Sequence, residues 1–96
     1  MTEQRMQKNR LQIEAALAGV EAELAKLANG VQSVSTKREL EIIAFWLHKM
    51  LESLDIGVKV ETPGLAHLIV DTWQFDNRLS ELIVKAEYDY RCMKWP

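Results

Sequence analysis

Residues 6–31 of the chain read MQKNRLQIEAALAGVEAELAKLANGV, and this stretch decides the predicted fold. Its side chains form two rows with a spacing of seven residues. One row is Arg10, Leu17, Leu24 and Val31, and the other is Met6, Ile13, Val20 and Leu27. Two rows offset by three and four residues are typical of a helix that packs lengthwise against another helix. We therefore predict a long helix over residues 3–28 with a coiled-coil seam.

Two residues interrupt this seam. Gly19 lies in the helix interior, where glycine costs about 1 kcal/mol relative to alanine, and we interpret it as a point where another helix approaches closely. Arg10 occupies a seam position that leucine would normally fill. Either it sets the register or the choice of partner, or the seam opens to solvent there and Arg10 pairs with Glu14. We favour the second interpretation.

The rest of the chain carries two further helix signals. Thr36 and Glu39 have the spacing of a capping box, so a helix is predicted over residues 36–54. Thr62 followed by Pro63 is typical of a helix start, and the apolar pattern continues over residues 63–91. Asp76 and its neighbour Asn77 weaken the middle of that segment and allow a kink. The predicted fold is all-α, with three long helices in an antiparallel bundle that self-association completes.

The composition favours a single domain over residues 1–96. Hydrophobic residues make up 48% of the chain, which is enough for a packed core. The net charge is -2, and basic and acidic residues are evenly spread along the chain without a basic block, so we do not expect nucleic acid as a partner. A single cysteine and a polar N-terminal segment without a long apolar run predict a cytoplasmic protein that does not enter a membrane.

The segment IIAFWL, residues 42–47, is apolar on nearly every side of its predicted helix. Two neighbouring helices cannot cover a helix all round, so part of this segment is expected to contact another subunit or partner. Tryptophan and tyrosine are also enriched at binding hot spots. The residues that we predict to form a partner or self-association interface are Ile42, Phe45, Trp46, Trp73, Tyr88, Tyr90 and Trp95.

No spacing in the sequence indicates catalysis, a metal site or a cofactor. His48 and His67 fall on different predicted helices, and Cys92 lies near the end of the chain with no histidine close in sequence. The carboxylates are interpreted as solvated faces of helices, except that Asp71 and Asp76 flank aromatic residues and leave a pocket there as an alternative. We predict a protein that is not an enzyme.

The function that we predict is non-catalytic binding or masking of another protein, as small inhibitors, anti-activators and adaptors do, including those of phages and plasmids. A homo-oligomer is expected because apolar surface is left over. The alternative is a small helical regulator that binds nucleic acid or a nucleotide through a pocket or a dimer face. The basic residues that discriminate between these functions are Arg5, Lys8, Arg10, Lys37 and Arg38; their meeting on one face would favour the alternative.

Overall fold

The computed structural model describes residues 2–33, 35–72 and 78–93, and within them the chain forms four helices and no strand. The helices are α1 (Thr2–Ala28), α2 (Lys37–Ile56), α3 (Leu65–Thr72) and α4 (Arg78–Cys92). The all-α fold class is therefore confirmed. The predicted spans of the first two helices agree with α1 and α2 to within one or two residues.

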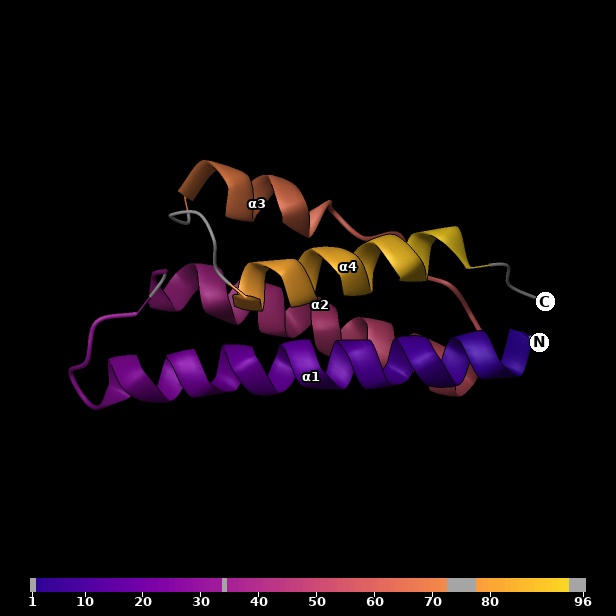
Figure 1. Cartoon of the computed structure of the whole chain (residues 1–96), viewed down its shortest axis with the longest axis horizontal. Coiled ribbons are helices and arrows are strands. Elements are labelled where there is room, and N and C mark those ends of the chain that lie inside the picture. The colour runs from indigo at the N-terminus through magenta and orange to yellow at the C-terminus, as the bar shows by residue number, and fades with distance from the viewer. Residues whose placement is uncertain (1, 34, 73–77, 94–96) are drawn as a thin grey trace.

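The long helix α1 packs against both α2 and α4, whereas α3 packs on α4 (Figure 1). Figure 1 also shows that the chain reverses its direction from each helix to the next, so that α1 begins and α4 ends at the same end of the molecule. The core between the helices contains Ile13, Val20, Leu40, Ile43, Leu47, Met50 and Ile83, all of which are fully buried.

The seam of α1 packs largely as the heptad rows predict. Ile13, Leu17 and Val20 are buried, while Val31 lies beyond the end of the helix and is 51% exposed. A Cβ atom placed on Gly19 would overlap Cδ1 of Leu79 on α4. The close approach of a second helix at Gly19 is therefore confirmed, and Leu79 is the side chain that uses the space.

Local capping explains where α2 begins and ends. The Oγ1 atom of Thr36 accepts a hydrogen bond from the backbone N–H of Glu39 at 3.2 Å, and Gly57 ends the helix in the left-handed conformation with φ of 76°. Near this end, Asp55 forms an ion pair with Arg10 of α1. The structure thus gives Arg10 a carboxylate partner on another helix, in place of the Glu14 pairing favoured from sequence.

The prediction of one helix over residues 63–91 is wrong. The structure has two separate helices here, α3 and α4, which run in opposite directions (Figure 1). The start also differs, because Gly64 has a φ of 83°, which an α-helix does not accommodate, and α3 begins only at Leu65. The kink expected at Asp76 and Asn77 lies outside the described residues.

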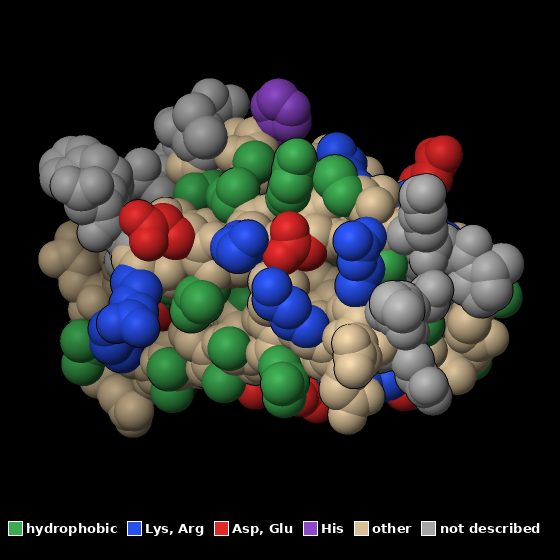
Figure 2. All heavy atoms as spheres, turned by 45° about the vertical axis from the view of Figure 1, so that its right-hand side comes forward, with side chains coloured by type: hydrophobic (Ala, Val, Ile, Leu, Met, Phe, Trp, Pro, Cys, Tyr) green, Lys and Arg blue, Asp and Glu red, His purple; other side chains and the backbone are tan. Residues whose placement is uncertain are grey.

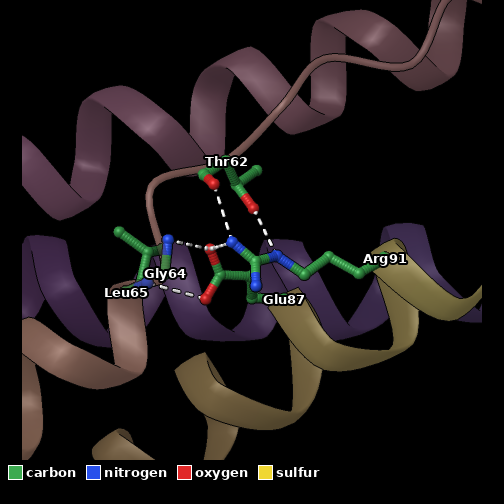
Figure 3. Close-up of polar contacts among 5 residues, drawn as sticks. All are labelled: Thr62, Gly64, Leu65, Glu87 and Arg91. Atoms are coloured by element: carbon green, nitrogen blue, oxygen red, sulfur yellow. Dashed lines mark hydrogen bonds and ion pairs between the residues drawn. The ribbon is translucent and has the colours of Figure 1, made fainter.

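The N-terminus of α3 is capped by a side chain from α4 rather than by Thr62. The buried Glu87 carboxylate accepts hydrogen bonds from the backbone N–H groups of Gly64 at 3.1 Å and Leu65 at 2.7 Å (Figure 3). The Nη2 atom of Arg91 lies 3.9 Å from Oε2 of Glu87. Arg91 also donates two hydrogen bonds to Thr62, from Nε to the side-chain Oγ1 at 2.9 Å and from Nη2 to the carbonyl oxygen at 2.7 Å. This cluster attaches α3 and the segment before it to α4.

A second buried contact joins α2, α4 and the segment between α2 and α3. The hydroxyl of Tyr90 lies 2.6 Å from the Oγ of Ser53, and it accepts a hydrogen bond from the backbone N–H of Val60 at 2.9 Å. Tyr90 is fully buried and Ser53 is 1% exposed. The tyrosine ring therefore packs in the core while its hydroxyl pairs with Ser53 and supplies the acceptor for the backbone N–H of Val60.

Candidate functional site

The face of α2 that points away from the bundle is the first candidate site. Leu40, Ile43 and Leu47 turn toward the core, and Phe45 lies on the opposite side of the helix. The exposed residues around Phe45 form what we call the outer face of α2: Arg38, Glu41, Ile42, Phe45, His48, Lys49 and Glu52. Phe45 is 52% exposed and Ile42 is 36% exposed, so an apolar patch lies at the centre of a charged surface.

Trp46 contacts Phe45 at the edge of this patch. Its ring meets the Phe45 ring edge to face, with 5.4 Å between the ring centroids and 88° between the ring planes. Trp46 is only partly exposed and also packs against the core. The Lys49 ammonium lies 5.6 Å from the centroid of the Phe45 ring on its other flank. These contacts hold Phe45 in place while leaving half of its surface accessible.

The other predicted interface residues do not join this patch. Tyr88 is 65% exposed, but it lies on α4, where it lines a cleft of about 470 Å³ with Ile69 of α3. Tyr90 is fully buried, so its side chain belongs to the core of the chain and not to its surface. Trp73 and Trp95 lie outside the described residues. The structure therefore brings together Ile42, Phe45 and Trp46 and separates them from Tyr88 and Tyr90.

A second candidate site is a cavity of about 240 Å³ between the N-terminal half of α1 and the C-terminal half of α4. Its lining includes the cationic side chains of Arg5, Lys8 and Lys85 and one carboxylate, Asp89. Lys85 forms an ion pair with Asp89, with 3.4 Å between Nζ and Oδ2. Neither Arg5 nor Lys8 forms an ion pair with another described residue. In Figure 2, Lys and Arg side chains gather in the middle of the visible face, around an acidic group.

Asn9 forms part of the wall of this cavity and was not predicted from the sequence as a site residue. Its Nδ2 donates to the carbonyl oxygen of Ala86 and to Oε1 of Gln12, both at 3.0 Å. Its Oδ1 is buried and has no hydrogen-bond partner within the described part of the chain. The sequence does contain an indication of this role. Asn9 stands at the start of the row that Ile13, Ala16 and Val20 continue, and it is the polar residue in a row that is otherwise apolar and buried.

The basic residues that discriminate between the predicted functions do not converge within the chain. Arg5 and Lys8 line the cavity near the start of α1, and Arg10 pairs with Asp55. Lys37 and Arg38 lie in the first turn of α2, at the opposite end of a molecule that is 44 Å long (Figure 1). A single chain therefore offers no continuous basic face built from these five residues.

Two titratable side chains near the end of α4, Tyr88 and Cys92, interact with each other. The side-chain hydrogen bond with Cys92, and next the negative charge of Cys92 in its thiolate form, raise the pKa of Tyr88 above its ordinary value. Cys92 is exposed. Among the described residues, no group of three or more His, Cys, Asp or Glu side chains is arranged to hold a metal ion.

Comparison with known proteins adds no candidate function. No family model matches the chain, and no curated protein and no solved structure resembles it at a significant level. Within the described ranges, no helix combines the length and the apolar character needed to cross a lipid bilayer. The candidate sites therefore stand on their own geometry and chemistry.

Proposed function

We propose that this protein is a non-catalytic interaction module that binds a protein surface through the outer face of α2. The observation that carries the proposal is the position of Phe45, which keeps 52% of its surface exposed in the middle of a twenty-residue helix. Ile42 lies one turn away and Trp46 braces the ring. A large aromatic residue held in place at the centre of a charged rim is a typical binding hot spot.

The mode of binding follows from the shape of the site. The outer face of α2 is convex, so it suits a partner with an apolar groove that accepts a helix. Ile42 and Phe45 are three residues apart, which is a spacing of apolar anchor residues in such complexes, and Lys49 belongs to the charged rim around them. The protein would act by occupying or masking the groove of its partner.

Site-specific photo-crosslinking tests this proposal. A photoreactive phenylalanine analogue is introduced at Phe45, and in a separate variant at Leu11, which is exposed to 63% on α1 and serves as the control. We expect a discrete protein adduct from position 45 and none from position 11. The protein found in this adduct is then purified. We expect Phe45→Ala to weaken the affinity for that protein at least about tenfold, as replacement of a hot-spot aromatic residue does.

The proposal fails if position 45 gives no protein adduct beyond that of position 11. It also fails if Phe45→Ala leaves the affinity for the crosslinked partner unchanged. Both positions are exposed on helices, so the substitutions should preserve the fold. Circular dichroism of the variants measures whether the helices are retained.

A second candidate function is supported by the cavity between α1 and α4. Arg5 and Lys8 supply positive charge at the cavity, and neither forms an ion pair with another described residue. These features suit a small anionic ligand such as a phosphate ester or a nucleotide. Titration with inorganic phosphate and with a nucleotide, followed by amide NMR, should shift the Asn9 side-chain signals. Shifts that persist in an Arg5→Ala, Lys8→Ala double variant would contradict this assignment.

A further inference from the structure

The charged residues on the outer face of α2 divide by sign between the two sides of Phe45. At about 100° per residue, Glu41 lies about 40° and Glu52 about 20° to one side of Phe45. Arg38 lies about 20° and Lys49 about 40° to the other side. We call these the acidic flank and the basic flank of the outer face. All four charged side chains are exposed.

Exposed apolar side chains lie between the two flanks. Ile56, the last residue of α2, is 64% exposed and lies within about 20° of the direction of Phe45. Phe45 and Ile56 are eleven residues apart, about 16 Å along the helix, and the two charges of each flank span the same length. Lys37, about 80° from Phe45, lies outside this sector. The face thus presents an apolar strip with an acidic edge and a basic edge.

The charges of both flanks are available to a partner. None of the four forms an ion pair with any other residue that the structure describes. Lys49 and Glu52 are three residues apart, a spacing that allows pairing along a helix. The Lys49 ammonium instead lies 5.6 Å from the centroid of the Phe45 ring, next to the apolar strip.

We propose that the partner of the outer face of α2 is a protein with an apolar groove whose two rims carry opposite charges. Basic side chains of one rim face Glu41 and Glu52, and acidic side chains of the other rim face the basic flank. Phe45 and Ile56 occupy the floor of the groove. This inference rests on the proposed function, because it states the chemistry of the partner for the same surface.

Rims of opposite charge also fix the direction in which α2 lies in the groove. Turning the helix end for end keeps its apolar strip in the groove but exchanges the two flanks, so that like charges face each other along both rims. A groove with rims of a single sign repels one of the flanks in either direction. Antiparallel pairing with a second copy sets acidic flank against acidic flank and is repulsive for the same reason.

Reversal of one flank at a time tests the two rims. The probe is the protein recovered in the crosslinked adduct of position 45, and its affinity for the full chain is measured at about 0.01 M and about 0.15 M salt. The acidic-flank variant is Glu41→Lys, Glu52→Lys, and the basic-flank variant is Arg38→Glu, Lys49→Glu. Each should weaken binding at least about tenfold. Added salt should weaken wild-type binding more than that of either variant, because screening removes the attraction.

The matched control is Glu14→Lys, Glu21→Lys, which makes the charge change of the acidic-flank variant at two exposed positions of α1 and should leave the affinity unchanged. The neutral variant Glu41→Gln, Glu52→Gln preserves side-chain size and should lose less affinity than the reversal. Circular dichroism measures whether every variant retains its helices.

Three outcomes would overturn the inference. A groove with rims of a single sign would make one flank variant bind more weakly and the other more tightly. Uncharged rims would leave both variants at the affinity of the wild type. An adduct of position 45 that consists of two copies of this chain would replace the grooved partner. In all three cases position 45 still marks a binding surface, so the proposed function stands, whereas the absence of any adduct there removes both.

Discussion

Replacement of Glu87 by glutamine should loosen the attachment of α3. The carboxylate of Glu87 is 4% exposed and accepts hydrogen bonds from the backbone N–H groups of Gly64 and Leu65. Glu87→Gln preserves the size of the side chain, but it turns one of the two acceptor oxygens into an NH₂ donor. One of the two backbone N–H groups would then face a donor while buried.

The magnitude follows from the two interactions that are lost. A hydrogen bond to a charged group contributes about 1.5–3 kcal/mol, and a negative charge at a helix N-terminus adds about 0.3–1 kcal/mol. We therefore expect a loss of roughly 2–3 kcal/mol in the free energy of unfolding. For a chain of 96 residues, this corresponds to a fall in Tm of about 10–20 °C.

Thermal unfolding by circular dichroism and amide hydrogen exchange together measure this effect. The matched control is Glu81→Gln, which changes an exposed carboxylate on the same helix. If α3 detaches before the bundle unfolds, the loss appears as faster exchange at Gly64 and Leu65 while α1 stays protected. A Glu87→Gln variant with the Tm of the control and unchanged exchange at both amides would refute the assignment of Glu87 as the cap of α3.

Three further predictions follow from the fold. Tyr90→Phe should lower the free energy of unfolding by about 1–3 kcal/mol, since it removes the hydrogen bond to Ser53 and the acceptor of the Val60 N–H; Tyr88→Phe, at an exposed position, is its control in the same urea titration. Gly19→Ile should cost about 1–3 kcal/mol by overpacking against Leu79, and a melting temperature equal to that of the wild type would contradict the close approach. Cys92→Ala should lower the pKa of Tyr88 toward its ordinary value, because the thiol raises it; NMR titration of the tyrosine ring detects the change, and an unaltered pKa would exclude the thiol as the cause.

The sequence predicted α1 and α2 well because their determinants are local. The heptad rows fix the buried side of α1, and Thr36 and Gly57 supply the ends of α2 within a few residues of the helix itself. The start of α3 was missed for the opposite reason. Its cap is Glu87, which lies 22 residues beyond Leu65 in sequence, and no local pattern connects the two.

The candidate site was predicted only in part. The exposure of Ile42 and Phe45 follows from an apolar segment that two neighbouring helices cannot cover. Tyr88 and Tyr90 were assigned the same role because they are of the same residue type, yet only Tyr90 points into the core, and its orientation depends on where α4 lies.

The packing of α1 against both α2 and α4 has a consequence for the order in which the chain folds. The α1–α2 hairpin closes over a connection of a few residues, whereas α1 and α4 meet through contacts such as Asn9 with Ala86, which are 77 residues apart. During synthesis, α1 can therefore pair with α2 first, and its contacts with α4 form only after α4 has been synthesised. The α1 residues that contact α4 include Asn9, Gln12 and Gly19, whose side chains are polar or small, so these positions expose no large apolar side chain before α4 arrives.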